Sequence, residues 1–169
     1  MSDQSLLHIP VVDNDGNLCG LEILQDLIES PVYGNPIFLM AGGFGTRLHP
    51  LTKDTPKPLL KVGIKPILEM IIEQFISYGF HNFYISTHFK SEQIRDYFKN
   101  GELHNISIKY LHEDTPLGTA GSLGLLPNNL PDLPMIVMNG DLLTKVNFKE
   151  LLRYDHTFSL FSSVISFFQ

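Results

Sequence analysis

The chain has 169 residues, of which 43% are hydrophobic, and a formal net charge of -6. This length suits one domain with an appendage, and the apolar content is ordinary for a globular chain. The acidic charge argues against a nucleic-acid-binding protein, which would usually be basic, but a small phosphorylated ligand needs only a few local cations.

Cysteine, leader and membrane signals exclude further classes of protein. Cys19 is the single cysteine, so an internal disulfide framework is excluded. The N-terminus shows no signal-peptide pattern, which favours a cytoplasmic location, and the longest apolar runs fall short of the ~20 residues of a membrane span. The seven histidines are not spaced as zinc ligands, so we interpret them as surface or packing residues.

Residues 1–30 are predicted to form a separate unit. Residues 8–12 and 18–23 are short apolar strand candidates, and residues 13–17 between them are a dense turn signal. Residues 24–29 indicate one or two helical turns after the second strand.

The acidic turn does not match an EF-hand calcium loop. Leu18 stands where that loop has its glycine, and Leu24 stands where it has its last glutamate. A hairpin turn is the prediction instead. Residues 31–35 are then expected to be a linker, with Pro31 and Gly34 as breakers.

A glycine-rich turn follows the first apolar run of the larger unit. Residues 37–41 are predicted to form a buried strand, and residues 42–46 contain three glycines directly after it. Glycines let the backbone pass close to a ligand and point successive N–H groups at an anion such as a phosphate chain. Arg47 adds a planar cation that can grip two phosphate oxygens, and Lys57 is a point charge held between two prolines.

Two other glycine-loop patterns fail in this turn. The dinucleotide pattern G-x-G-x-x-G would need glycine where Leu48 stands, and the P-loop pattern needs a Gly-Lys dipeptide, which the chain lacks. The alternative for the glycines by themselves is an ordinary tight turn after a strand.

Strands and helices alternate along the rest of the chain. Apolar residues at helical spacing predict a helix over residues 65–78, with Gly79 as its stop. A second helix, capped by Ser91, is expected to run to about Lys99 and to turn inward Ile94, Tyr97 and Phe98. The other predicted elements are strands at residues 83–87, 106–111 and 133–143 and a helix at residues 148–154. This alternation predicts an α/β fold with a mostly parallel sheet and helices on both faces, and ligands then bind outside the carboxyl ends of the strands.

Small residues crowd the segment at residues 112–126, ahead of an apolar run. Two interpretations stay open for it. The segment is either a loop that enters a close-packed helix, or a flat surface on which a nucleobase and its ribose lie against the backbone. The small residues are Gly118, Thr119, Ala120, Gly121 and Ser122.

Asp141 ends the strand predicted at residues 133–143. A carboxylate at the tip of a buried strand is well placed to hold Mg²⁺ against phosphates, because magnesium takes few protein carboxylates and completes its shell with phosphates and water. The alternative is an aspartate that caps the following helix.

The string AGGFGTRLHPLTKDTPKPLLKVGIKPIL closely resembles the signature of the sugar-1-phosphate nucleotidyltransferases, and it does so in four linked pieces. The resemblance implies a Rossmann-like nucleotide-binding domain over residues 36–155, in which the glycine loop cradles a nucleoside triphosphate and two cations contact its outer phosphates. Carried over position by position, the nucleotide-binding residues are Ala41, Gly42, Gly43, Gly45, Thr46, Arg47 and Lys57.

The string LGTAGSL resembles the base-contacting loop of the same family, and looks most like the mannose-1-phosphate guanylyltransferase branch, which favours GTP. The implied reaction joins a nucleoside monophosphate to a sugar-1-phosphate in nucleotide-sugar biosynthesis, with Mg²⁺ as cofactor. Arg47, Lys57 and Asp141 would be the catalytic residues, with Asp141 as one of two magnesium ligands and the second well downstream. A homo-oligomer is compatible with the resemblance.

Residues 1–30 resemble a different family, in the string IPVVDNDGNLCGLEILQDLIES. It is similar to the closing part of a CBS domain, the paired module that senses adenosine nucleotides. A CBS domain needs more chain than this, so the protein is expected to start inside one. Two other functions stay open: a CBS-type regulatory protein, and a non-catalytic fragment that binds a nucleotide.

Residues 156–169 depart from the nucleotidyltransferase pattern. HTFSLFSSVISFFQ is apolar and uncharged apart from its histidine, where family members continue with polar residues and another strand. A frameshifted or truncated product would explain this, and implies an incomplete, inactive form whose sheet has an uncovered apolar edge. The alternative is a natural hydrophobic helix that packs on the sheet. The segment is also β-prone and free of proline, as aggregating segments are.

Overall fold

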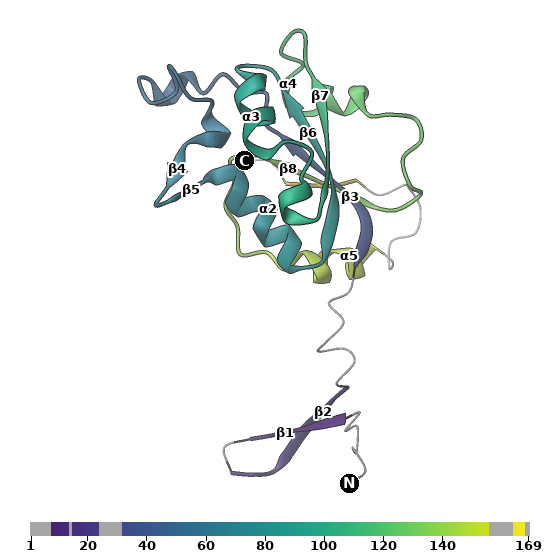
Figure 1. Cartoon of the computed structure of the whole chain (residues 1–169). Coiled ribbons are helices and arrows are strands. Elements are labelled where there is room, and N and C mark those ends of the chain that lie inside the picture. The colour runs from purple at the N-terminus through teal and green to yellow at the C-terminus, as the bar shows by residue number, and fades with distance from the viewer. Residues whose placement is uncertain (1–7, 14, 24–31, 156–163, 168–169) are drawn as a thin grey trace. The chain divides into compact units, whose positions relative to one another are not determined.

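The computed structural model describes residues 8–13, 15–23, 32–155 and 164–167 (Figure 1). The chain divides into two compact units, Met1–Val32 and Tyr33–Gln169, each with its own internal contacts. No helix in the described ranges is both long and apolar enough to cross a membrane.

The first unit contains an antiparallel hairpin of β1 (His8–Val12) and β2 (Leu18–Ile23), which confirms both predicted strands. The carboxylate of Asp13 holds the turn, because it accepts the backbone N–H of Asn17 at 2.9 Å and that of Asp15 at 3.0 Å. The hydrogen bond from the Asn17 backbone is the main cause that lowers the pKa of the exposed Asp13 carboxyl from its usual value. The helical turns predicted at residues 24–29 lie outside the described residues.

The second unit is built on a five-stranded sheet in the order β7-β6-β3-β8-β9, in which every neighbouring pair is parallel. The parallel sheet predicted from the sequence is therefore confirmed. Because the strands are parallel, their carboxyl ends all lie at one edge of the sheet, and ligands bind at that edge in such folds. The strands are β3 (Tyr33–Met40), β6 (Phe80–Thr87), β7 (Ser107–His112), β8 (Met135–Asn139) and β9 (Val164–Phe167).

Several boundaries of the sheet differ from the prediction. Strand β6 begins at Phe80 rather than at residue 83, and β8 covers only Met135–Asn139 of the predicted 133–143, so Asp141 lies beyond the strand. The first strand begins at Tyr33, so the last three residues of the expected linker at 31–35 lie in β3. In the tail, Val164–Phe167 forms β9 and pairs with β8, so a hydrophobic helix is wrong for these four residues, and the rest of the tail lies outside the described residues. Val164, Ile165 and Phe167 are β-branched or aromatic residues, which favour strands.

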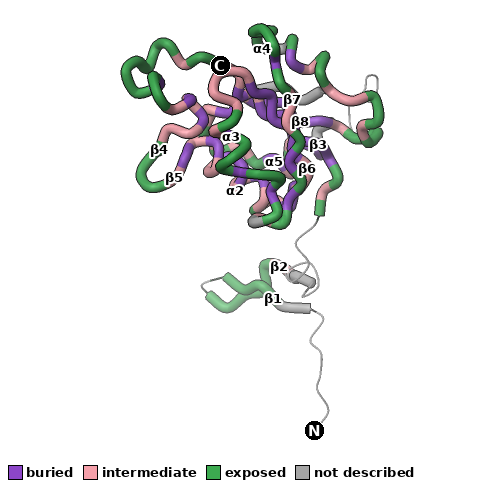
Figure 2. The backbone as a smooth tube through the Cα atoms, turned by 45° about the horizontal axis from the view of Figure 1, so that its top comes forward, coloured by how far each residue is buried: buried purple, intermediate pink, exposed green. Residues whose placement is uncertain are grey.

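Both faces of β3 are buried, as its continuous apolar run requires. Ile37 and Leu39 belong to the larger hydrophobic cluster, whereas Phe38 belongs to a second cluster on the other face. None of the three side chains is accessible to solvent. Figure 2 shows this buried centre within the sheet and the exposed residues around it.

Three helices cover the larger cluster: α2 (Ile67–Ser77), α3 (Ser91–Phe98) and α5 (Phe148–Asp155). These three helices therefore lie on one face of the sheet, and the prediction that helices of this kind cover both faces is wrong for them. The second cluster is covered by Leu123, from the short helix η4 (Ser122–Leu125), and by the segment that follows it. The connection from β7 to β8 reverses direction across β3, and right-handed crossovers place a reversed connection on the opposite face.

Helix α2 follows its predicted pattern. Its buried residues Leu68, Ile71, Ile72 and Phe75 form one stripe, and the chain leaves the helix through Gly79 at a left-handed φ of 93°.

Helix α3 differs from its prediction in two details. Ser91 is its first helical residue rather than its cap, and Lys90 precedes it in a left-handed conformation without a side-chain cap. Tyr97 is exposed, and its hydroxyl donates to the Glu69 carboxylate at 2.7 Å. Only Ile94 and Phe98, four residues apart, share the buried face of this two-turn helix.

Prediction for the core: Phe75→Ala lowers the free energy of unfolding by about 3–5 kcal/mol, because Phe75 is fully buried and its ring stacks on that of Phe148 with centroids 4.1 Å apart. Urea unfolding followed by circular dichroism measures the change. The control Ile64→Ala removes a side chain that is 86% exposed and should change stability by less than about 0.5 kcal/mol. Equal losses in the two variants would contradict this account of the core.

Candidate functional site

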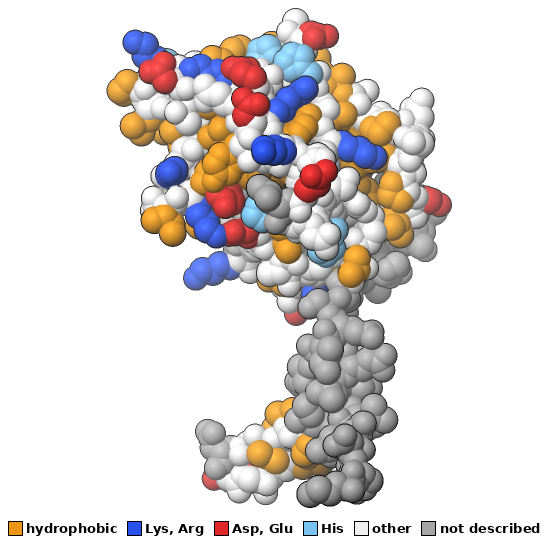
Figure 3. All heavy atoms as spheres, in the orientation of Figure 1, with side chains coloured by type: hydrophobic (Ala, Val, Ile, Leu, Met, Phe, Trp, Pro, Cys, Tyr) orange, Lys and Arg blue, Asp and Glu red, His pale blue; other side chains and the backbone are white. Residues whose placement is uncertain are grey.

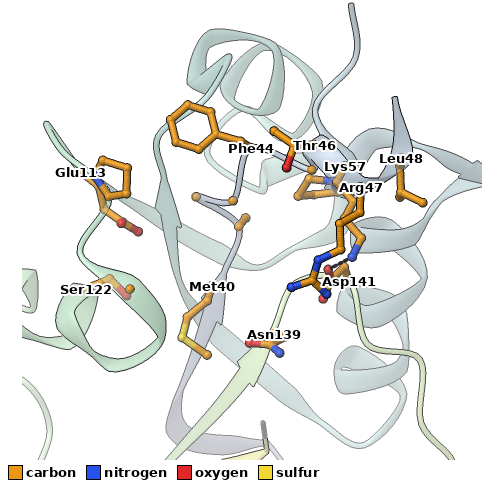
Figure 4. A pocket seen from close by; sticks show the side chains of 17 residues that line it. Met40, Phe44, Thr46, Arg47, Leu48, Lys57, Glu113, Ser122, Asn139 and Asp141 are labelled. Carbon is orange, nitrogen blue, oxygen red and sulfur yellow. Dashed lines mark ion pairs between the residues drawn. The ribbon is translucent and has the colours of Figure 1, made fainter. Parts of the chain in front are cut away.

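A cleft of about 680 Å³ lies at the carboxyl ends of β3 and β8 (Figure 4). Four segments of the chain line it: the end of β3 with the glycine turn, the stretch around Lys57, the segment after β7, and the end of β8. The lining residues are Met40, Ala41, Gly42, Gly43, Phe44, Gly45, Thr46, Arg47, Leu48, Lys57, Pro58, Glu113, Pro116, Gly118, Ser122, Asn139 and Asp141.

The glycine turn needs glycine at two of its positions. At Gly42, an added Cβ would lie 2.6 Å from the Glu113 carboxylate oxygen Oε1. Gly45 has a left-handed φ of 65°, and an added Cβ would lie 2.9 Å from the Thr52 side chain, whose hydroxyl donates to the Gly45 carbonyl at 2.8 Å. Around Gly43 nothing lies within 4 Å of an added Cβ, so the backbone there is open to the cleft.

Arg47, Lys57 and Asp141 lie together at one end of the cleft (Figure 4). Arg47 belongs to the short helix η1 (Thr46–Leu48), and Lys57 begins η2 (Lys57–Leu59) next to the buried Pro58. The Lys57 ammonium and the Asp141 carboxylate form an ion pair. Two cations are thus held at this end with one carboxylate between them, an arrangement that suits a polyanion bridged to the protein by a divalent cation.

The residues at the end of β8 fit Mg²⁺ held jointly with phosphates. Asp141 is part-exposed and presents a carboxylate, and the Asn139 amide lines the same wall of the cleft. Within the described ranges no three His, Cys, Asp or Glu side chains form a metal-binding group, but magnesium needs only one or two protein ligands beside substrate phosphates. The alternative of a helix cap is wrong for Asp141, because Asn147 accepts the N–H groups of Lys149 and Glu150 at the start of α5.

The segment after β7 contributes Gly118 and Ser122 to the cleft, two of the residues that the sequence predicted to contact a nucleotide. Gly118 has a left-handed φ of 75° at the start of the single turn α4 (Gly118–Gly121). Gly121 does not line the cleft, and Thr119 and Ala120 are described only as part of the backbone of α4.

Sequence reasoning missed Glu113, which is only 5% exposed yet lines the cleft. Its carboxylate oxygen Oε2 accepts the backbone N–H of Leu117 at 3.1 Å, and its own N–H donates to the Thr87 carbonyl at 2.8 Å. The signal that could have found it is the one used for Asp141: an acidic residue directly after a strand of a parallel sheet.

Comparison with known proteins assigns the chain to a family. The model of the family described as nucleotidyl transferase matches residues 37–159, which include every segment that lines the cleft. The chain belongs to the nucleotidyltransferase family. This confirms the resemblance found in the glycine turn and the residues after it.

One relative of this nucleotidyltransferase chain is the mannose-1-phosphate guanylyltransferase catalytic subunit beta of Drosophila pseudoobscura pseudoobscura. It is 34% identical over 125 residues, which cover 72% of this chain and 33% of the relative. The chain therefore spans about a third of the length of this curated relative.

Two solved structures share the fold at 27% identity. One is described as a glucose-1-phosphate thymidylyltransferase from Bacillus anthracis in complex with sucrose, with a TM-score of 0.66 over 73% of this chain and 50% of that chain. The other is HddC from Yersinia pseudotuberculosis in complex with GMP-PN, with a TM-score of 0.64 over 72% of this chain and 54% of that chain.

Prediction for the turn: Gly42→Ala lowers the free energy of unfolding by about 1–3 kcal/mol, because the new methyl group must displace the buried Glu113 carboxylate. The matched control Gly43→Ala enters open space and should change stability by less than about 1 kcal/mol. Urea unfolding measures both. In a Glu113→Ala background the loss from Gly42→Ala should shrink, and an unchanged loss would contradict the close contact.

Proposed function

We propose that the cleft binds a nucleoside triphosphate and that the protein transfers its nucleoside monophosphate to a sugar-1-phosphate, with release of pyrophosphate. One observation carries the proposal: the glycine turn, Arg47, Lys57 and Asp141 converge on a single cleft at the carboxyl edge of the sheet. The family assignment supports the same reaction, because its relatives include sugar-1-phosphate nucleotidyltransferases.

The chemistry that this geometry suits is an in-line displacement at the α-phosphorus. A sugar-1-phosphate oxygen forms the new bond, the bond to the β-bridging oxygen breaks, and pyrophosphate leaves with the electron pair. The work of the protein is positioning and charge neutralisation. The glycine-turn N–H groups would cradle the phosphate chain, and Arg47 and Lys57 would neutralise the outer phosphates that depart.

Mg²⁺ bound through Asp141 would add positive charge beside the reacting phosphate. Because Lys57 pairs with Asp141, a bound cation and a bound triphosphate would each take over one partner of this ion pair.

GTP is the triphosphate that we propose, because the segment at Gly118–Gly121 and Ser122 resembles the guanylyltransferase branch. Two relatives support it: a mannose-1-phosphate guanylyltransferase at 34% identity, and HddC in complex with GMP-PN. The thymidylyltransferase from Bacillus anthracis is a relative with another base, so the choice of base depends on residues in the cleft.

A second candidate function concerns the first unit alone. A CBS-type function, which rests on the sequence resemblance of residues 1–30, predicts that an adenine nucleotide binds to these residues. A non-catalytic fragment predicts instead that the cleft of the second unit binds a nucleotide without turnover. Nucleotide binding by the separate units distinguishes these functions from the one proposed.

Prediction for the phosphate contacts: Arg47→Ala and Lys57→Ala each weaken GTP binding by roughly 1.5–3 kcal/mol and weaken GMP binding far less, because both cations are assigned to the outer phosphates. Calorimetry with Mg²⁺ present measures both ligands. The control Lys61→Ala removes an exposed lysine outside the cleft and should leave both affinities unchanged. Equal losses for GTP and GMP would contradict the assignment.

Prediction for the base: unlabelled GTP displaces a labelled GTP analogue at a lower concentration than dTTP or CTP does. All three competitors carry the same triphosphate, so any difference reports contacts to the nucleoside. Displacement by dTTP at the lower concentration would reject GTP as the preferred substrate.

A further inference from the structure

The Lys57–Asp141 ion pair joins two groups that the proposed function assigns to different ligands. The Lys57 ammonium is assigned to the outer phosphates, and the Asp141 carboxylate is assigned to Mg²⁺. In the structure each side chain is the partner of the other, and neither makes a further ion pair or hydrogen bond within the described residues. Figure 4 shows the pair at the end of the cleft, with Arg47 beside it.

Both partners stand on backbone that neighbouring segments hold in place. Lys57 begins η2, and its Cβ lies 3.2 Å from the position that a Cβ at Gly45 would take, so it packs against the glycine turn. Directly before Asp141, the N–H of Gly140 donates to the Met40 carbonyl at 2.8 Å, and an added Cβ at Gly140 would lie 3.0 Å from that oxygen. The fold itself therefore brings the ammonium and the carboxylate together.

Each ligand by itself competes with one half of this pair. A divalent cation that binds Asp141 displaces the Lys57 ammonium and then lies beside it, so that two cations repel each other. A triphosphate that binds Lys57 leaves the Asp141 carboxylate unpaired beside the phosphates, so that two anions repel each other. The side chains are only 36% and 28% exposed, so solvent screens these charges incompletely. When both ligands bind together, every charge faces an opposite charge.

We propose that the Lys57–Asp141 pair makes the cleft selective for a metal–triphosphate complex over the free cation and over the metal-free triphosphate. This selectivity rests on the proposed function and names the form in which the cleft takes its substrate. It comes from what the pair opposes as much as from what it attracts. Because coupling free energies are reciprocal, the cation strengthens triphosphate binding by the same factor as the triphosphate strengthens cation binding.

Cation binding without nucleotide tests one half of the pair. Lys57→Met removes the ammonium and keeps an apolar stem, so it frees the Asp141 carboxylate. Mn²⁺ is the probe, because it suits oxygen ligands as Mg²⁺ does and broadens nearby NMR signals. It should broaden the amide signals of residues 139–142 at a concentration about threefold lower, or lower still, in the variant than in the unaltered protein, the size expected for one part-exposed ion pair. The control Lys61→Ala removes an exposed lysine outside the cleft and should leave this concentration unchanged.

Triphosphate binding without metal tests the other half. In EDTA, Asp141→Asn should bind GTP about threefold or more tightly than the unaltered protein, because the carboxylate no longer holds Lys57 or repels the phosphates. With Mg²⁺ present, the same variant should bind GTP less tightly, because it has lost the metal ligand. Unfolding would weaken binding in both conditions, so it cannot cause this reversal. The control Asp54→Asn removes a carboxylate that is 90% exposed and lies outside the cleft, and it should change neither affinity.

The outcomes separate this inference from the function on which it rests. Mn²⁺ broadening at an unchanged concentration in Lys57→Met overturns the inference, and so does metal-free GTP binding that is unchanged or weaker in Asp141→Asn. In either case, GTP binding by the unaltered protein with Mg²⁺ leaves the proposed function standing. If the unaltered protein binds no GTP in the presence of Mg²⁺, the proposed function fails, and the inference fails with it.

Discussion

The parallel pairing of β3 with β6 on one side and β8 on the other is the constraint on which the site depends. Met40 lies opposite Ser86 in β6 and Asn139 in β8, so three strands reach the edge of the sheet at the same level. The N–H of Gly140 then donates to the Met40 carbonyl at 2.8 Å and continues this pairing beyond β8. As a result the glycine turn and Asp141, which are about a hundred residues apart in sequence, leave the sheet side by side.

The cleft is electrically polarised, although the whole chain is acidic. Basic and acidic side chains are interspersed over the face of the second unit that Figure 3 shows. Within the cleft, Arg47 and Lys57 lie at one end together with the Asp141 carboxylate, and Glu113 lies apart from them. The phosphates of the ligand that we propose are anionic, so the end of the cleft that holds the two cations would attract them. Complementary charge of this kind gives specificity and orientation more than raw affinity.

The sequence predicted best those helices and strands that a local pattern of apolar residues determines. The apolar spacing of Leu68, Ile71 and Phe75 gave helix α2, and the continuous apolar run before Gly42 gave strand β3. Arg47, Lys57 and Asp141 could be selected because each follows a glycine turn, follows a strand or lies between two prolines. The sequence could not show that Lys57 and Asp141 form an ion pair, since that contact depends on how two distant segments meet.

The other misses have physical causes as well. Glu113 lies in a polar stretch that looks like a solvated loop, and only its burial against Gly42 reveals a site residue. Tyr97 was placed inside from its apolar character, but its hydroxyl draws it out to Glu69. In the tail, Val164–Phe167 finds its partner in β8, a tertiary contact that overrides any helical preference of an uncharged apolar segment.

The central claim is that the nucleotide lies at the carboxyl edge of the sheet, and amide hydrogen exchange with and without Mg²⁺ and GTP tests it most directly. We expect slower exchange in the glycine turn at residues 42–47 and in the segment at residues 113–122, because the ligand covers both. The β1–β2 hairpin should exchange as before. Protection confined to residues 8–23, with no change in the glycine turn, would contradict the account and move the nucleotide to the first unit.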